Sequence, residues 1–286
     1  RLLPGASING RREKIESHYC CSMKSPISFL SEGTAPLTEL NDIPISSTVL
    51  VTDFDQTLTT ADSPTSLSIL LNQAEISTES SPKLETRRNE LRKWSTMSEM
   101  AKMVVCHHDM EIRRHATERN LDVFHKLGKA GKFGSQAERC VFESSAEMRD
   151  GVSDALKSFL KLGGKICVVS TGYEEIVRAV MLKGGIKVDD YDEGSISIVA
   201  NSFFNDCVKI TTDTKCGCVS QDDYISKRGV IVVGDRPLDS GMCNHWGNVE
   251  CLVKVGVLAD EDEQSLLENF NYVSEDWTFL KNACRR

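Results

Sequence analysis

Long hydrophobic runs are missing from the sequence, and proline and aromatic residues are few. No stretch approaches the roughly 20 consecutive apolar residues that a membrane-spanning helix needs, so we expect a soluble protein without a membrane partner. Only 7 of the 286 residues are proline and only 6% are aromatic, whereas 40% are hydrophobic and 27% are charged. This composition excludes collagen-like, low-complexity and wholly disordered chains, and the length supports a large buried core.

An excess of basic residues is also lacking. The chain carries 34 lysines and arginines against 42 acidic residues, for a net charge of −8 and an isoelectric point of about 5.4. Such a chain has no general positive field that would draw it onto nucleic acid or anionic lipid. We therefore expect no binding to duplex nucleic acid.

The 11 cysteines are an odd number, and several of them lie in apolar or strand-like runs, such as Cys167 and Cys251. A secreted disulfide framework is smaller and has more evenly spaced cysteines, so the pattern favours buried free thiols in a reducing compartment, the cytoplasm. Cys216-x-Cys218 and the Cys-His-His run at 106–108 offer metal-binding residue types. No second pair follows at ligand spacing, and adjacent residues on a helix point in different directions, so zinc is the less favoured interpretation.

Residues 1–47 differ in composition from the rest of the chain. They are rich in serine, proline and glycine, and hydrophobic periodicity begins only at Thr48. We expect a disordered N-terminal extension. Residues 1–31 contain five basic and two acidic residues, so the alternative is the remnant of a targeting sequence, which would place the protein in an organelle.

Strand-like and helix-like segments alternate along the remaining sequence. Residues 48–53 are a short β-branched run that is typical of a buried strand. Helix-like periodicity extends from residue 62 to about 143, and Gly163-Gly164 ends an amphipathic helix that begins at Gly151. Further strands are expected at 165–169, 195–203, 207–212, 230–233 and 249–253, with another helix at 173–182.

Strands that alternate with helices form βαβ units and a parallel sheet. We therefore predict an α/β fold with a doubly wound, Rossmann-like core. The core consists of residues 48–61 and 147–286, and residues 62–146 are inserted into it as a helical cap.

Two carboxylates stand at the carboxyl end of the first strand, where an open parallel sheet places its ligands. Alternation directs Asp53 and Asp55 to the same side and turns Phe54 into the core. Carboxylates held together repel each other unless a cation or a proton lies between them. The alternative is a strand end followed by a capped turn, because Asp and Thr are good caps.

Later strand ends carry matching chemistry. Ser170-Thr171-Gly172 follows one buried strand, and Asp235 and Asp239 follow another. Carboxylate oxygens suit Mg²⁺, and hydroxyl groups together with backbone N–H groups suit a phosphate. The pattern predicts a site that binds Mg²⁺ and a phosphate ester at this edge of the sheet.

From residue 48 to about 282 the sequence resembles the haloacid dehalogenase superfamily. Asp53-x-Asp55 matches the first motif of that superfamily, Ser170 the second and Gly234-Asp235-x-x-x-Asp239 the fourth. The resemblance implies that Asp53 is a nucleophile that forms an aspartyl-phosphate and that Asp55 is the general acid–base. It also implies Mg²⁺ bound by Asp53, the backbone of Asp55, Asp235 and Asp239. An acid at the position of Asp55 indicates a phosphatase rather than a dehalogenase.

The resemblance further implies a set of phosphate-binding residues. These are Thr57, Ser170, Thr171, Gly172 and a lysine of the third motif. Lys215, which follows a Thr-Asp-Thr turn, is our choice for that lysine; Lys209 is the runner-up, and Lys227 also precedes Asp235.

Within the superfamily the sequence is most similar to the cytosolic pyrimidine 5′-nucleotidase family. Residues 247–258, 200–203 and 149–151 carry this likeness. Leu238 replaces a glycine of that family's fourth motif, and Trp94 and Glu99 stand without the spacing of its base-contacting residues.

We therefore predict Mg²⁺-dependent hydrolysis of a phosphomonoester, with a pyrimidine nucleoside 5′-monophosphate as the preferred substrate. A small-metabolite phosphatase or phosphotransferase is one alternative, and a non-catalytic binding protein on the same scaffold is another. The sequence predicts no particular oligomeric state.

Overall fold

The structure is a computed structural model of the 286-residue chain. It describes eight stretches of the chain: residues 28–30, 42–60, 147–192, 194–202, 210–211, 214–247, 249–259 and 263–285. The expected cap at 62–146 lies outside these residues, as does nearly all of the expected N-terminal extension.

Seven strands form a single sheet in the order β1-β7-β6-β5-β2-β3-β4, and every neighbouring pair is parallel. The strands are β1 (Ser28–Leu30), β2 (Thr48–Asp53), β3 (Lys165–Tyr173), β4 (Ile196–Asn201), β5 (Gly229–Gly234), β6 (Cys251–Val257) and β7 (Tyr272–Ser274). Parallel strands need crossover connections, and helices supply most of them. The expected doubly wound α/β core is confirmed.

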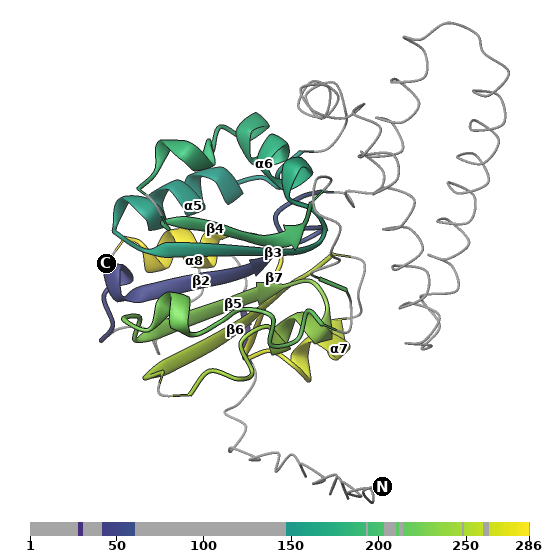
Figure 1. The fold of residues 1–286 in the computed structure, drawn as a ribbon. Coiled ribbons are helices and arrows are strands. Elements are labelled where there is room, and N and C mark those ends of the chain that lie inside the picture. Colours follow the sequence, from purple (N-terminus) through teal and green to yellow (C-terminus); the bar gives the residue numbers. More distant parts are fainter. Residues whose placement is uncertain are drawn as a thin grey trace, which may run out of the picture.

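Helices lie on both faces of this sheet (Figure 1). Those on one face are α5 (Val152–Lys161), α6 (Glu174–Lys183) and α8 (Thr278–Ala283), and their buried side chains pack with Leu50, Ile231 and Val255. The other face is covered by segment 219–246 and α7 (Glu263–Leu267). Segment 219–246 includes the 3-10 helices η4 (Asp222–Tyr224) and η5 (Pro237–Gly241).

Burial on both faces explains the sequence of the central strands. Every residue of β2 and of β5 is buried. In β2, Val49 and Val51 point to one hydrophobic cluster, and Leu50 points to the other. A strand covered on both faces is expected to be a continuous β-branched run rather than an alternating one, and this is why both strands could be predicted.

Several elements differ from the predicted ones. Strand β4 ends at Asn201, and Ile210 and Thr211 are not in a strand, so the predicted strand at 207–212 is wrong for those two residues. Residues 207–209 and Thr212 lie outside the described part of the chain. Strand β7 was not predicted. Ser28–Leu30, within the stretch expected to be disordered, pairs with β7 and therefore differs from that expectation.

The described residues that precede and follow the stretch 61–146 lie next to each other. Thr59 and Met148 form an antiparallel bridge, and the N–H of Thr60 donates to the carbonyl of Glu147 at 3.0 Å. Arg149 stabilises this pairing, because its side chain donates to the carbonyls of Thr59 and Leu258. Residues 59–60 and 147–149 therefore lie side by side, next to the turn that follows β2.

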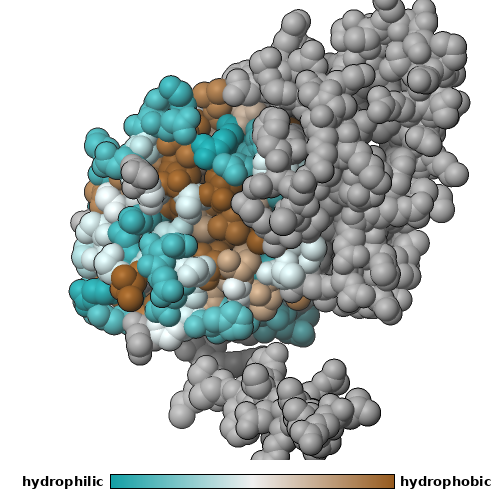
Figure 2. Space-filling view, viewed as in Figure 1, coloured by the Kyte–Doolittle hydropathy of each residue, from teal (hydrophilic) through white to brown (hydrophobic). Residues whose placement is uncertain are grey.

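The described surface combines hydrophilic residues with some hydrophobic ones. Figure 2 shows hydrophobic residues gathered in a band across the middle of one face, between hydrophilic residues. Among the described residues, three large hydrophobic side chains are exposed: Leu162, Ile225 and Leu252. No helix in the described stretches is both long and apolar enough to cross a membrane.

Candidate active site

The site lies where the order of the strands reverses. From the central strand β2 the chain continues outward through β3 and β4, and then crosses back to β5 on the other side of β2. Asp53 is the last residue of β2, and Asp235 immediately follows β5. Ligands of open α/β sheets bind at such a switch point, outside the carboxyl ends of the strands.

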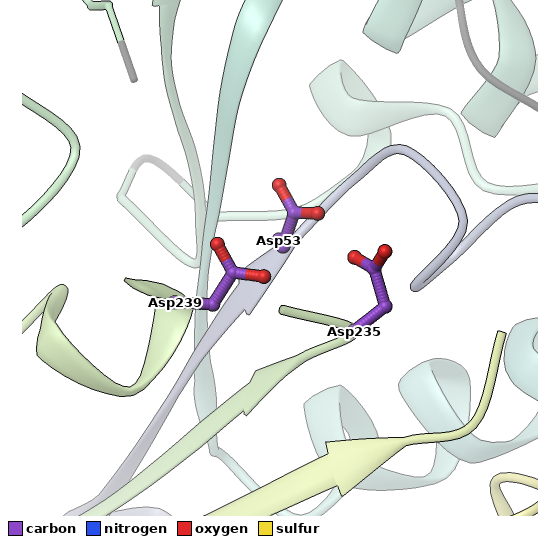
Figure 3. Close-up of side chains that lie close together, drawn as sticks. All are labelled: Asp53, Asp235 and Asp239. Atoms are coloured by element: carbon purple, nitrogen blue, oxygen red, sulfur yellow. The ribbon is translucent and has the colours of Figure 1, made fainter. Parts of the chain in front are cut away.

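Three carboxylates converge at this point. One oxygen from each of Asp53, Asp235 and Asp239 lies within 4.8 Å of the others, and all three residues are buried, with exposed fractions of 5%, 1% and 1%. Figure 3 shows them grouped around the ends of β2 and β5. Gly234 makes the approach of Asp239 feasible, because a Cβ at this glycine would overlap the Cβ of Asp239. Glycine is the residue that permits such a close approach.

Lys215 supplies the positive charge among these carboxylates. Its Nζ contacts Oδ1 of Asp53 and lies 2.6 Å from Oδ1 of Asp239. Burial disfavours the ammonium form, but Asp239 and Asp53 outweigh burial and raise the pKa of Lys215. The lysine is therefore charged at neutral pH, in a place that water hardly reaches.

Thr57 links the two strand ends. Its hydroxyl lies 2.8 Å from Oδ1 of Asp235 and 3.3 Å from Oδ2 of Asp53. A threonine hydroxyl has one proton to donate, so only one of these carboxylates can receive it at a time. Trp277 stabilises the loop that carries Thr57, because its buried indole N–H donates to the Thr57 carbonyl at 3.1 Å.

Burial makes the carboxylates weaker acids than usual. It raises the pKa of Asp53 to about 6, although Lys215 lowers it, and Asp235 adds to the rise. Burial and the neighbouring Asp239 raise the pKa of Asp235, and burial also raises the pKa of Asp239 against the opposing effect of Lys215. The cluster therefore holds more negative charge than its one lysine can balance.

The residues fit a divalent cation. Oδ2 of Asp235 is buried and has no hydrogen-bond partner among the described residues, and Nε of Arg236 lies 3.6 Å from it. A buried polar atom without a partner is costly, and a bound cation would remove that cost. Closely spaced carboxylate oxygens are the ligands that Mg²⁺ prefers, so the donor set suits this ion.

A hydroxyl and an irregular stretch of backbone lie in the last part of the neighbouring strand β3. Ser170 directly follows Val169, the partner of Asp53 in the sheet, and is fully buried. The N–H of Gly172 donates to the Ser170 hydroxyl at 2.9 Å. The register between β3 and β4 shifts between Val169 and Tyr173, so this stretch leaves the regular ladder. Such irregularities are frequent beside active sites, where they redirect a side chain.

The structure brings most of the predicted site residues to one edge of the sheet. Asp53, Thr57, Lys215, Asp235 and Asp239 are joined by the contacts given above. Three other predicted residues, Ser170, Thr171 and Gly172, lie in the last part of β3, which pairs with β2, and Asp55 lies in the turn after β2 and is half-buried. The runner-up lysine at 209 lies outside the described residues. The roles of all these residues remain predictions.

Two contributors were not selected from the sequence. Trp277 supports Thr57 from a position 220 residues later in the chain, and no local pattern indicates so distant a contact. Asn201 was noted only as part of the stretch 200–203, yet its side chain donates to the carbonyls of Thr171 and Ile210. The signal for Asn201 in the sequence was an amide side chain near the end of a predicted strand, which begins at residue 195.

The pH dependence of stability should reveal the Asp53 carboxyl. Its folded pKa of about 6 lies above the ordinary value of 3.8, so between these values the folded protein holds a proton that the unfolded chain has released. In this window the contribution of Asp53 to the free energy of unfolding falls as the pH rises. Without metal, Asp53→Asn should gain stability relative to the wild type between pH 4.5 and 7.5, by about 2 kcal/mol at roughly 1.4 kcal/mol per pKa unit.

Urea unfolding in EDTA at the two pH values measures this difference. Asp154→Asn, on the exposed side of α5, is the matched control for replacing a carboxyl group by an amide. A difference between Asp53→Asn and the wild type that does not change between the two pH values would contradict the raised pKa.

Comparisons with known proteins bear on the fold. No protein-family model and no curated protein matches the sequence. The structure of cytosolic 5′-nucleotidase IIIB bound to cytidine is similar, with 18% identity, a TM-score of 0.62, and coverage of 86% of this chain and 88% of that one.

Two further structures are more distant. One is a predicted phosphatase from Clostridium acetobutylicum, with 18% identity, coverage of 84% and 99%, and a TM-score of 0.46. The other is a haloacid dehalogenase-like family hydrolase from Streptococcus pneumoniae, with 14% identity, coverage of 83% and 98%, and a TM-score of 0.41. The likeness to the nucleotidase shows a shared fold, and the other two are too distant to add to it.

Proposed function

We propose that this chain, which has the haloacid dehalogenase-like fold, is a phosphatase that hydrolyses phosphomonoesters through an aspartyl-phosphate. The convergence of three buried carboxylates with one lysine carries the proposal. These groups lie at the carboxyl ends of β2 and β5, and one carboxylate oxygen has no hydrogen-bond partner among the described residues. An arrangement of this kind costs stability, and proteins keep such costs at functional sites.

Asp53 is the nucleophile in the proposed reaction. One of its carboxylate oxygens forms a bond to phosphorus, and the bond between phosphorus and the leaving alcohol oxygen breaks. Asp55 donates a proton to that oxygen, and then accepts a proton from the water that attacks the aspartyl-phosphate. The second step regenerates Asp53 and releases inorganic phosphate. Lys215, which contacts Asp53, lies where it can bind the phosphoryl oxygens.

Asp53 and Asp235 would hold Mg²⁺, together with the backbone carbonyl of Asp55. Asp239 already binds Lys215 and the N–H of Arg236 at 3.0 Å, so it would support this ion through its charge. When bound, Mg²⁺ reduces the repulsion between the Asp53 carboxylate and a phosphate dianion and stabilises the charge that develops during transfer. Ser170 and the adjoining backbone would bind the remaining phosphate oxygens.

The preferred substrate in this proposal is a pyrimidine nucleoside 5′-monophosphate. The similar structure of a 5′-nucleotidase with bound cytidine supports this choice, as do the sequence segments at 200–203 and 247–258. A small-metabolite phosphatase or phosphotransferase remains the alternative, because residues 62–146 contain no recognisable base-contacting pattern. The proposal also includes a reducing compartment, the cytoplasm, since the described cysteines are free thiols.

The experiment is a phosphatase screen of the purified chain with Mg²⁺. It compares UMP and CMP with sugar phosphates, phosphoamino acids and p-nitrophenyl phosphate. We expect phosphate release that EDTA abolishes and Mg²⁺ restores, with the highest kcat/KM for UMP and CMP. Equal rates for sugar phosphates would reject the nucleotidase and leave the phosphatase. No turnover of any ester would favour a binding protein, and full activity in EDTA would exclude the metal.

A further inference from the structure

Asn201 lies at the end of edge strand β4 and is fully buried. Its amide nitrogen donates to the carbonyls of Thr171 and Ile210, each at 2.9 Å, and its amide oxygen accepts the N–H of Ile210 at 3.1 Å. These partners define the orientation of the amide, because two carbonyls need the nitrogen and one N–H needs the oxygen. One side chain therefore connects two segments of the backbone.

The first of these segments is the irregular end of β3. Thr171 lies where the register between β3 and β4 shifts, and its carbonyl accepts a hydrogen bond from the Asn201 side chain. Thr171 stands between Ser170 and Gly172 in the irregular last part of β3. Asn201 consequently helps to hold the stretch 170–172, which we assign to phosphate binding.

The second segment leads to the lysine of the site. Ile210 is almost completely buried, and Asn201 binds both its N–H and its carbonyl, as a neighbouring strand would. One residue later, the carbonyl of Thr211 accepts the N–H of Lys215 at 3.0 Å. On the far side of the lysine, the N–H of Gly217 donates to the carbonyl of Gly241 at 2.9 Å. Backbone hydrogen bonds therefore hold the chain on both sides of Lys215, at Ile210 before it and at Gly217 after it.

We infer that Asn201 is a positioning residue that sets Lys215 against Asp53 and holds the segment before Lys215 next to Thr171 in the last part of β3. The anchor at Gly241 connects the lysine to η5, which carries Asp239, and Asn201 connects it to the sheet, which carries Asp53. Removing the amide takes away the hydrogen bonds that hold Ile210, in the segment before Lys215, against the end of β4. The catalytic consequence of this inference rests on the proposed phosphatase function, whereas the structural consequence does not.

Chemical labelling of lysine tests the structural consequence without any substrate. Lys215 is 7% exposed and lies in a buried ion pair, so brief acetylation of the wild type should leave it unmodified. Lys187, whose side chain is 56% exposed, serves as the internal reference. Peptide mass spectrometry should find Lys215 labelled at least about tenfold more in Asn201→Ala, relative to Lys187, because a misplaced buried ion pair loses its protection.

Two further variants keep the test independent of general unfolding. Asn201→Asp preserves the size of the side chain and the oxygen that accepts from Ile210, but it removes the NH₂ group that binds the two carbonyls, and Lys215 labelling should rise in it as well. Ser202→Ala is the matched control, because it removes a hydroxyl at the neighbouring position, and that hydroxyl donates to Glu175 on α6 at 2.5 Å. Labelling in this variant should equal that of the wild type. Unchanged protection of Lys215 in folded Asn201→Ala or Asn201→Asp overturns the inference.

Kinetics with p-nitrophenyl phosphate tests the catalytic consequence. We expect kcat to fall roughly 10²-fold in Asn201→Ala, the scale of a small misplacement of a catalytic group. In a Lys215→Ala background the same substitution should reduce kcat by clearly less than 10²-fold, because the part of its effect that acts through the lysine is gone and only its effect through Thr171 is left. A multiplicative loss in that background would indicate a general structural role. An inactive wild type with released Lys215 in the variants would reject the phosphatase and leave the positioning role standing.

Discussion

Asp53→Asn should abolish hydrolysis of every phosphate ester that the wild type cleaves. Asparagine has nearly the same shape as aspartate, but its amide is not a nucleophile toward phosphorus and cannot form the acyl-phosphate bond. We expect kcat to fall on the order of 10⁴-fold or more, as when other enzymes lose a catalytic nucleophile. Quenched-flow experiments should detect a phosphoenzyme in the wild type and none in the variant.

The fold should survive this substitution, which separates chemistry from unfolding. Asp53 is a buried carboxyl with a raised pKa, so its replacement relieves repulsion and should preserve or increase stability. Asp55→Asn provides the comparison within the site, because it should slow both steps yet still permit some phosphoenzyme to form. Substantial activity in Asp53→Asn would mean that the nucleophile lies elsewhere.

The core of the fold could be predicted because its signals are local. Strands β2 and β5 are buried on both faces, so they appear in the sequence as uninterrupted β-branched runs. Asp53 and Asp235 follow those runs directly, and parallel strands bring their carboxyl ends together whatever the intervening sequence is. The burial of Phe54 was also predictable from alternation alone.

Elements with short or distant determinants could not be predicted. Strand β7 has three residues and follows no extended run, so its pairing with β6 and β1 decides its existence. The predicted strand at 207–212 is absent at Ile210 and Thr211 because the side chain of Asn201, rather than a strand, satisfies the Ile210 backbone. The contact of Trp277 with Thr57 depends on the folded arrangement of segments 220 residues apart. Tertiary packing overrides local preference at all three places.

Lys215→Met should destabilise the metal-free protein strongly. Its ammonium lies between Asp53 and Asp239, in a place where all three side chains are less than one tenth exposed. Removing one partner of a buried ion pair leaves an uncompensated charge and costs about 3–5 kcal/mol. Urea unfolding in EDTA at pH 7.5 measures the loss. Lys187→Met is the matched control, since Lys187 pairs with Asp190 at 2.9 Å while both side chains are more than half exposed, and such exposed pairs contribute little.

Charge, rather than lost packing, should account for the effect of Lys215→Met, and two conditions distinguish these causes. At pH 4.5 the carboxyl groups, which burial already makes weaker acids, gain protons in place of the missing ammonium, so the deficit in unfolding free energy should shrink. Added Mg²⁺ should raise the Tm of Lys215→Met more than that of the wild type, because the ion supplies positive charge to carboxylates that have lost their lysine. A deficit that stays constant with pH and with Mg²⁺ would assign the effect to packing and would remove the electrostatic basis of the proposed site.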